Sequence, residues 1–207
     1  MSQPTTTTRP KGRATHQQPP AATVRRRRRQ AVAIWIAAAV GLVAIVAAMM
    51  WSSKPSAPDP TGAAPGFTLT DTSGEVHRLS DHLGENVLIY FSEGSGCQSC
   101  TVQMRELERR SEALEDMNVT VLPIVMNSRE EILPDMQRDG VQTPFLLDDG
   151  TVSKKYDTLG KGMHAGLPGH GFILVDTEGN QLWRGEYPSM WVDPDELLDV
   201  VQDRLGA

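Results

Sequence analysis

The chain has 207 residues, of which 39% are hydrophobic and 22% charged, an ordinary composition for a globular protein. Its formal net charge of −6 hides an uneven distribution. Residues 1–30 hold eight basic residues and no acidic one, whereas the other twelve basic and all twenty-six acidic residues lie from residue 51 onward, giving that part a charge of −14. So acidic a part repels phosphates, which argues against nucleic acid binding. Two cysteines exclude a disulfide-rich scaffold and a zinc site made of four cysteines.

The N-terminal region predicts a membrane anchor. Residues 1–30 are rich in Thr, Pro, Gln and Arg and have little to bury, so we expect a disordered basic tail. Residues 31–51 are 21 residues without a charge. As a helix they would span about 31 Å, enough to cross a bilayer once. Five arginines precede this segment and only Lys54 follows it closely, which predicts a single-pass protein of the cell membrane with a cytoplasmic N-terminus.

A cleaved signal peptide is the alternative interpretation of the same segment. Signal peptides have a shorter apolar core, of about 7–15 residues, followed by a cleavage site of small residues. Residues 47–51 offer no such site, which favours an uncleaved anchor. Residues 52–64, rich in Pro, Ser and Ala, then predict a linker. Residues 65–207 are long enough for one extracytoplasmic domain with its own core.

The first elements of this domain surround its cysteines. Residues 67–70 and 75–79 flank a turn-forming cluster and predict a small hairpin. Residues 86–91 form a nearly continuous apolar run, typical of a central strand buried on both faces. After Gly94 and Gly96 break the chain, apolar residues recur at helical spacing as far as Leu114. This pattern predicts an amphipathic helix that begins near Cys97.

The rest of the domain alternates strands and helices. In chain order the pattern predicts a strand over 119–126, a helix over 130–138, a short strand over 145–147, a helical turn over 152–156, a hairpin of 172–175 with 181–184, and a last helix capped by Asp193. Pro123 removes one hydrogen-bond donor from this strand, which limits the length over which it can pair. Alternation bracketed by hairpins predicts an α/β domain with a mixed central sheet and helices on both faces.

Cys97 and Cys100 are the motif whose spacing carries chemistry. At the start of a helix, unpaired backbone amides and the helix dipole stabilise the thiolate of Cys97, and Cys100 lies one turn further on, within disulfide reach. A thiolate attacks a disulfide, forms a mixed disulfide and is released when the second thiol attacks in turn. The pair therefore predicts thiol–disulfide exchange, with no cofactor and no metal.

Two other interpretations of the pair remain open. As a structural bridge it would close a loop of only four residues and stabilise the fold by about 2 kcal/mol. As half of a zinc site it needs two more ligands, for which His77, His82, His164 and His170 are the candidates. Glu93, in the loop before Cys97, is a candidate for relaying a proton to Cys100.

Several segments occur in the order found in a known family. They are Pro65–Asp71, Leu79–Asp81, Asn86–Phe91, Cys97–Cys100, Pro144–Gly150 and Phe172–Gly179. In this order they resemble the thioredoxin-like redoxins of the alkyl hydroperoxide reductase/thiol-specific antioxidant superfamily, and their membrane-anchored, extracytoplasmic disulfide-reductase branch. The resemblance spans nearly all of residues 65–205. It implies a thioredoxin-like fold, with Cys97 as the nucleophile, Cys100 as the resolving thiol, and Pro168 as the match to a cis-proline beside the substrate groove.

The departures from this family bear on the reaction. The reductases carry an aromatic residue before the first cysteine, where this chain has Gly96. Peroxiredoxins proper carry a Pro-x-x-x-Thr-x-x-Cys pattern; counted back from Cys97, the Pro and Thr places hold Tyr90 and Gly94. Counted back from Asp176, Pro168 stands two residues early for the cis-proline.

The sequence thus predicts a membrane-anchored thiol–disulfide oxidoreductase. The resemblance implies that it reduces disulfides of other exported proteins and receives electrons from a membrane or extracytoplasmic thiol donor. A thiol peroxidase is one alternative. The other is a copper-binding module that resembles copper chaperones of the same fold, with His164 or His170 beside the two thiols.

Overall fold

The structure is a computed structural model that describes residues 35, 40, 41, 62–160 and 165–206. The chain divides into two units, Met1–Met49 and Met50–Ala207, and every element below belongs to the second. The predicted tail, most of the predicted membrane segment 31–51 and most of the predicted linker lie outside the described residues. Among the described helices, none has the length and apolar character needed to span a bilayer.

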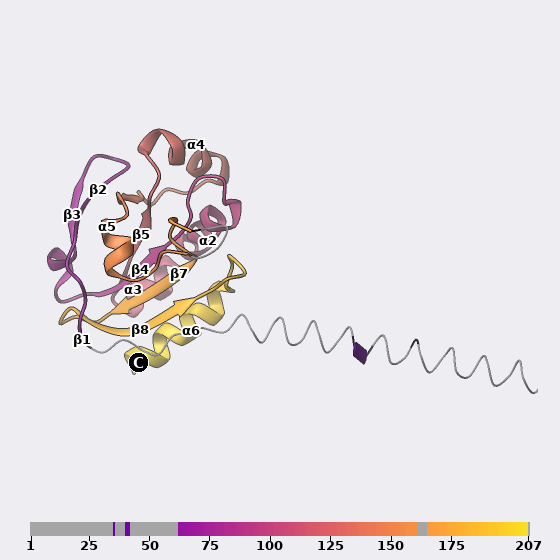
Figure 1. The fold of residues 1–207 in the computed structure, drawn as a ribbon. Helices are drawn as coiled ribbons and strands as arrows, with labels where there is room; N and C mark the ends of the chain where they lie inside the picture. Colours follow the sequence, from indigo (N-terminus) through magenta and orange to yellow (C-terminus); the bar gives the residue numbers. More distant parts are fainter. Residues whose placement is uncertain (1–34, 36–39, 42–61, 161–164, 207) are drawn as a thin grey trace, which may run out of the picture. The chain divides into compact units, whose positions relative to one another are not determined.

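One mixed sheet of eight strands organises the second unit (Figure 1). Its strands, in chain order, are β1 (Gly62–Ala63), β2 (Thr68–Asp71), β3 (Val76–Arg78), β4 (Asn86–Phe91), β5 (Val119–Val125), β6 (Leu146–Leu147), β7 (Gly171–Val175) and β8 (Asn180–Glu186). Across the sheet they lie in the order β1-β8-β7-β4-β5-β6-β2-β3. β4, β5 and β6 run parallel, whereas β7 pairs antiparallel with β4 and β8. The predicted mixed sheet is confirmed.

β4 is central because both of its faces are apolar. Leu88 and Tyr90 point to one core, and Val87, Ile89 and Phe91 point to the other. Side chains alternate between the two faces of a strand, so a continuous apolar run fits only a position covered on both sides. β4 accordingly lies between β7 and β5, and the loop after Phe91 leads directly to Cys97.

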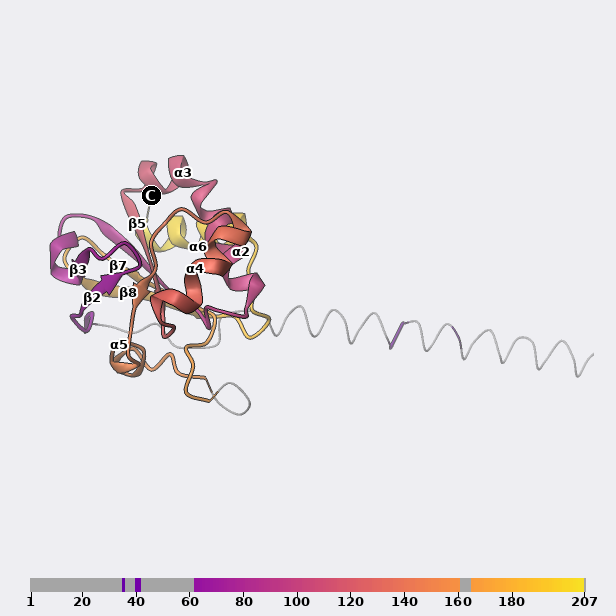
Figure 2. The same cartoon turned by 90° about the horizontal axis from the view of Figure 1, so that it is seen from above.

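Helices cover both faces of the sheet, as the sequence predicts. They are η1 (Leu79–His82), α2 (Gln98–Glu108), α3 (Ser111–Asp116), α4 (Arg129–Asp139), α5 (Thr151–Lys155) and α6 (Pro194–Leu205). Buried residues of α2, α3, α4 and α6 share the core of Leu88 and Tyr90. Residues of η1 and α5 share the opposite core with Phe91. Figure 2 shows α2, α4 and α6 grouped together, with α5 set apart from them.

Pro123 lies inside β5 without breaking it. Ile124 O accepts a hydrogen bond from Ser92 N, beyond the end of β4, so Ile124 directs its peptide groups toward β4. Pro123 therefore directs its nitrogen to the other side, since successive residues of a strand face opposite neighbours. On that side β6 pairs only with Ile124 and Val125. The missing donor thus lies just outside the paired region, and β5 continues through Pro123.

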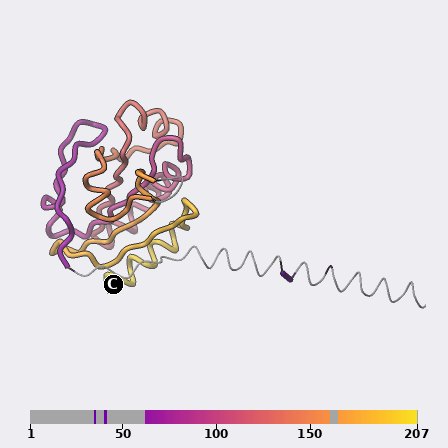
Figure 3. The backbone as a smooth tube through the Cα atoms, in the orientation of Figure 1, coloured from indigo at the N-terminus to yellow at the C-terminus, as the bar shows by residue number. Residues whose placement is uncertain are grey.

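Two boundaries differ from the prediction. The helix expected from near Cys97 to Leu114 is divided into α2 and α3, because Arg110 leaves helical geometry (φ −112°, ψ 20°). The folded domain also begins earlier than residue 65. Gly62–Ala63, which composition assigns to the linker, pair with β8. In Figure 3 the coloured trace of this unit begins with a violet segment that includes them. Both residues of β1 are exposed, so no pattern of buried apolar residues in the sequence predicts this strand.

Candidate redox site

The two cysteines lie where β4 gives way to α2. Cys97 is the N-cap residue of α2 and Cys100 occupies its first turn. Their sulfur atoms form a disulfide, with the Cα atoms 5.4 Å apart. Cys97 N donates to Gly94 O at 3.0 Å, and Cys100 N donates to Cys97 O at the same distance. The predicted position of the pair at a helix start is confirmed.

The two sulfurs differ in their exposure. Cys97 is half-buried, whereas Cys100 is fully buried. No side chain caps α2 at Cys97, and the first turn of the helix carries no acidic residue. The helix start therefore offers its partial positive charge to the Cys97 sulfur without competition from a carboxylate in that turn. An incoming sulfur or peroxide reaches Cys97 before Cys100.

The loop before Cys97 is held by side chains from the neighbouring chain segments. Asn127 Oδ1 accepts from Ser95 N at 2.8 Å, and Asp135 Oδ2 accepts from Gly96 N at 2.9 Å. Gly94 adopts φ +74°, and a Cβ atom there would lie 1.9 Å from Asn127 Oδ1. Glycine is required at position 94 both for its backbone conformation and for this close approach.

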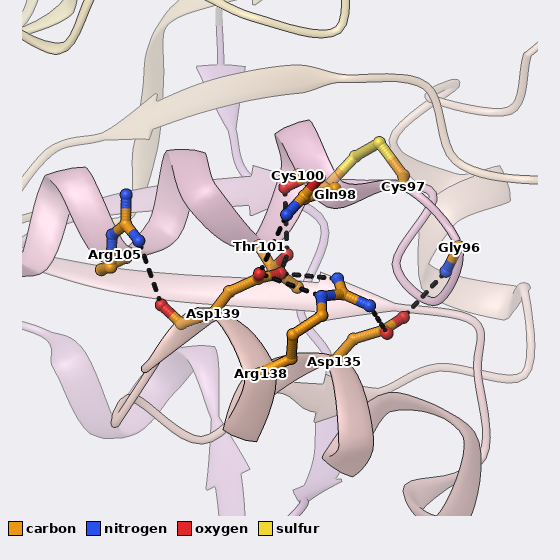
Figure 4. Close-up of polar contacts among 9 residues, drawn as sticks. All are labelled: Gly96, Cys97, Gln98, Cys100, Thr101, Arg105, Asp135, Arg138 and Asp139. Carbon is orange, nitrogen blue, oxygen red and sulfur yellow. Dashed lines mark hydrogen bonds and ion pairs between the residues drawn. A yellow bond between two sulfur atoms is a disulfide. The ribbon is translucent and has the colours of Figure 1, made fainter.

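A cluster of polar side chains from α4 fixes the start of α2 (Figure 4). Arg138 binds Asp139 through two nitrogens, at 3.0 and 2.6 Å, and also pairs with Asp135. The Asp139 carboxylate accepts hydrogen bonds from Thr101 Oγ1 and, at 3.3 Å, from Gln98 Nε2. Asp139 thereby links Gln98 and Thr101 of the active-site helix to Arg138.

The same contacts set the charges of the two acids. The Arg138 guanidinium and the hydrogen bonds from Thr101 and Gln98 lower the pKa of Asp139 to about 2, against the opposing effect of burial. The backbone N–H of Gly96 is the main reason that the pKa of Asp135 is lowered. Both carboxylates are charged at neutral pH, so the cluster is an ionic support for the cysteine loop.

Buried rings cover the other side of Cys100. His170, in the loop before β7, has its Nδ1 atom 3.8 Å from Cys100 Sγ and 3.2 Å from Tyr90 Oη. Tyr90 Oη also donates to Cys100 O at 3.1 Å. Tyr90 stacks on Phe172, with their ring centroids 4.6 Å apart. Burial lowers the pKa of His170 to about 3, so its imidazole is neutral near pH 7.

A cavity of about 360 Å³ lies against His170. Glu93, Arg184, Glu186 and Met190 are among the residues that line it. Glu186 is exposed, so the cavity reaches the surface. It lies on the Cys100 side of the pair, because His170 contacts both the cavity and the Cys100 sulfur.

Pro168 differs from the expectation in its peptide bond. No peptide bond in the described residues is cis, and this includes the bond that precedes Pro168. Pro168 is buried and forms an isolated bridge with Leu159. The residue against the cysteines is His170, two positions later, which agrees with the two-residue offset counted from Asp176 in the sequence. That offset was the one sequence signal that could have identified His170 as the neighbour of Cys100.

Among the described histidines, only His170 lies next to the cysteines, so the zinc and copper interpretations find one additional ligand in the described part of the chain. His77 pairs with Asp71 at 2.9 Å and His82 with Glu85 at 3.3 Å, which occupies both histidines with carboxylates. His164 lies outside the described residues. Asp71, Glu75 and His77 are the one grouping of three ligand-type residues in the described part of the chain. Asp71 Oδ1 in that group already accepts hydrogen bonds from Ser73 N, Ser73 Oγ and Glu75 N, as expected of a turn.

A half-exposed sulfur bonded to a buried one, at the first turn of a helix that follows a central strand, identifies a thioredoxin-like redoxin with oxidoreductase chemistry. Comparison with known proteins makes this specific. The family described as AhpC/TSA matches residues 60–180, more than half of the chain. The protein belongs to the AhpC/TSA family.

Known relatives divide between two activities. The chain is 29% identical to peroxiredoxin Bcp of Escherichia coli over 121 residues, which cover 56% of this chain and 78% of that protein. It is 30% identical to the thiol-disulfide oxidoreductase ResA of Geobacillus kaustophilus over 86 residues, 41% of this chain and 49% of that protein. The chain thus spans about half the length of the latter relative.

Solved structures share the fold. Mycobacterium tuberculosis AhpC superposes with a TM-score of 0.62 at 17% identity, covering 73% of this chain and all of that one. Peroxidoxin BcpB from the same organism gives 0.60 at 17% identity, covering 72% of this chain and 97% of that one. The predicted thioredoxin-like fold is confirmed.

Proposed function

We propose that the protein is a thiol–disulfide oxidoreductase in which Cys97 attacks the substrate and Cys100 resolves the mixed disulfide. The observation that carries this proposal is the asymmetry of the pair. Cys97 is reachable and lies on uncapped backbone amides, whereas Cys100 is fully buried and lies within bonding distance of Cys97 alone. A substrate sulfur therefore reacts with Cys97 first. Cys100 then attacks Cys97 and displaces the substrate sulfur.

The electron balance of the cycle follows from these roles. The Cys97 thiolate attacks a substrate disulfide, and one substrate sulfur leaves as a thiolate. Cys100 then attacks Cys97, the Cys97–Cys100 bond forms, and the second substrate sulfur leaves. The substrate gains two electrons and the pair loses two. A donor dithiol restores the pair by the reverse exchange.

We place this activity outside the cytoplasm. The uncharged segment 31–51 and the five arginines before it support an anchor with a cytoplasmic N-terminus. The substrates on this proposal are disulfides of exported proteins, and the donor is a thiol held in or near the membrane. Outside the reducing cytoplasm such a pair needs a supply of electrons.

A thiol peroxidase is the second candidate, and the likeness to peroxiredoxin Bcp specifically favours it. The cysteine loop argues the other way. Counted from Cys97, the Thr place of the peroxiredoxin pattern is Gly94, where the backbone has no room for a side chain. Counted from Cys100, the Pro and Thr places hold Glu93 and Cys97. Neither cysteine carries the pattern that implies efficient peroxide reduction.

Two assays on the full chain in detergent separate the candidates. We expect the reduced protein to reduce insulin, and Cys97→Ser to abolish this activity. Cys100→Ser should accumulate mixed disulfides with substrate, visible on a non-reducing gel, because the resolving thiol is gone. If the protein instead consumes hydroperoxide rapidly, leaves insulin oxidised and forms a sulfenic acid on Cys97, the peroxidase candidate replaces this proposal. His82→Asn, a substitution remote from the pair, is the control.

A further inference from the structure

His170 makes contacts that the exchange cycle above does not use. Its Nδ1 atom faces both Cys100 Sγ at 3.8 Å and Tyr90 Oη at 3.2 Å. The residue is only 3% exposed, and its Nε2 atom has no hydrogen-bond partner among the described residues. A buried polar atom without a partner is costly, so its retention calls for an explanation.

We propose that His170 is the base that takes the proton from the Cys100 thiol and so produces the resolving thiolate. This inference rests on the proposed roles of Cys97 and Cys100. It adds His170 to Cys97 and Cys100 as a third residue that takes part in the reaction. Nδ1 of His170 is the acceptor, since it is the ring nitrogen that faces the Cys100 sulfur.

The need for a base follows from the burial of Cys100. A thiol in apolar surroundings ionises less readily than one in water, yet only the thiolate attacks a disulfide. Cys100 is fully buried, beside the rings of Tyr90 and His170. While the cysteines are bonded, the imidazole of His170 is neutral and has a nitrogen lone pair. The burial that lowers its pKa also opposes its protonation, so the ring gains a proton only when a thiolate forms beside it, 3.8 Å away. After transfer, the thiolate and imidazolium stand in contact, and their attraction offsets part of the cost of burying them.

Tyr90 favours the proton on Nδ1 after the transfer. Its hydroxyl has one hydrogen, which points to Nδ1 at 3.2 Å while that nitrogen carries its lone pair and turns to Cys100 O at 3.1 Å once Nδ1 is protonated. The lone pairs of the same oxygen then face Nδ1 at 3.2 Å and accept from an Nδ1–H group. Tyr90 is thus a positioning residue, while His170 touches the reacting sulfur.

The resolving step then balances as follows. The proton of the Cys100 thiol passes to His170 Nδ1, and the Cys100 thiolate attacks Cys97 Sγ of the mixed disulfide. The Cys97–Cys100 bond forms, the bond from Cys97 to the substrate sulfur breaks, and the electron pair leaves on that sulfur. The substrate thiolate takes its proton from solvent, and His170 returns its own proton to solvent.

The cavity beside His170 provides the route for that proton. His170, Glu93 and Glu186 line it together, and exposed Glu186 brings it to the surface. The lining holds three carboxylates, of Glu93, Asp157 and Glu186, against the guanidinium of Arg184, which pairs with Glu186. The net negative charge favours a positive charge that appears briefly on the ring. The titratable or charged groups that face His170 or its cavity are Tyr90 on β4, Glu93 in the following loop, Cys100 on α2, Asp157 after α5, Arg184 and Glu186 on β8, and Tyr187 after it.

Reaction of the reduced full chain with dithiobis(nitrobenzoate) tests the role of His170 directly. This aromatic disulfide releases one coloured thiolate when Cys97 attacks it and a second when Cys100 resolves the adduct. Stopped-flow absorbance therefore reports the two steps as separate phases. Cys100→Ser, which gives only the first phase, assigns them.

We expect His170→Ala and His170→Asn to slow the second phase by about 100-fold, a typical contribution of a general base, and to leave the first phase unchanged. In His170→Ala the second phase should rise about tenfold per pH unit below the pKa of the thiol, because solvent must now generate the thiolate, whereas the wild type should depend less steeply on pH. Added imidazole should restore the rate of His170→Ala by entering the space next to the cavity. His82→Asn is the matched control, since His82 is paired with Glu85 and has no contact with the cysteines.

The outcomes distinguish this inference from the function on which it rests. No coloured release from the wild type would contradict the proposed cycle itself. Two normal phases in both His170 variants would overturn the role of His170 alone. Equal slowing of both phases, with no rescue by imidazole, would show that His170 only supports the fold, and the inference would be wrong.

Discussion

The two sides of the cysteine pair are built differently. On the α4 side, charged groups hold the loop and the start of α2, with Asp139 bound by Arg138, Thr101 and Gln98. On the β7 side the neighbours are rings, and one of them, His170, keeps a buried nitrogen without a partner in the described part of the chain.

This difference indicates that the two sides affect different properties of the cysteine pair. Ionic hydrogen bonds have defined directions, so the α4 side fixes where Cys97 and its loop lie. On the β7 side, burial disfavours any charge on Cys100, and the two ionisable rings of Tyr90 and His170 lie against it. Substitutions on the α4 side should therefore change stability, and substitutions on the β7 side should change the rate of the resolving step.

The largest stability effect is expected at Gly94. Gly94→Ala must place a Cβ atom 1.9 Å from Asn127 Oδ1 at a φ of +74°. We expect a loss of about 3 kcal/mol in the free energy of unfolding, from left-handed strain and from the displaced bond of Asn127 to Ser95. Gly96→Ala is the control: φ is +87° there, but nothing lies within 4 Å of the added atom. Gly96→Ala should lower the free energy of unfolding, measured in urea, by only about 1 kcal/mol. Equal losses in the two variants would mean that the contact with Asn127 is unimportant.

Asp139→Asn should have the next largest effect. It weakens the bonds from Arg138, and hydrogen bonds to charged groups contribute about 2 kcal/mol when partly buried. Asp203→Asn, on the exposed face of α6, should leave stability unchanged.

The effect of Asp139→Asn should depend on pH. Folding lowers the pKa of Asp139 from 3.8 to about 2, so the charged carboxylate stabilises the native state above pH 3.8. That contribution is lost as pH falls through about 2. The stability difference between wild type and variant should therefore be constant near neutral pH and shrink in acid. A difference that grows on acidification would contradict the assigned role of this carboxylate.

Tyr90→Phe should have the smallest effect on stability and a selective effect on rate. It keeps the ring that stacks on Phe172 and removes the hydroxyl that contacts Cys100 O and His170. We expect the free energy of unfolding to fall by about 1 kcal/mol. The second phase of the reaction with dithiobis(nitrobenzoate), in which Cys100 resolves the adduct, should slow about threefold. Tyr156→Phe is the matched control, because Tyr156 also donates a hydroxyl hydrogen to a carbonyl, that of Pro65, on the opposite face. A slower second phase in both variants would show that the effect is not local to the cysteines.

The sequence alone predicted the features that depend on neighbouring residues. The apolar run of β4, the helix start at Cys97 and the cap at Asp193 each follow from a local pattern, and each is found. Features that depend on distant segments were less accessible. Gly62–Ala63 join the sheet through backbone bonds to β8, and Arg110 divides a continuous apolar spacing into two helices.

For the site itself, the spacing of Cys97 and Cys100 predicted a disulfide, because two cysteines one helical turn apart lie within bonding distance. Which sulfur is more exposed, which acid supports the loop and which ring faces the buried sulfur were decided only by the tertiary structure. Asp139 is 38 residues from Thr101, and His170 is 70 residues from Cys100. Burial and charge at these positions come from the packing of α4 and β7 around β4 and α2, and no local pattern in the sequence encodes such contacts.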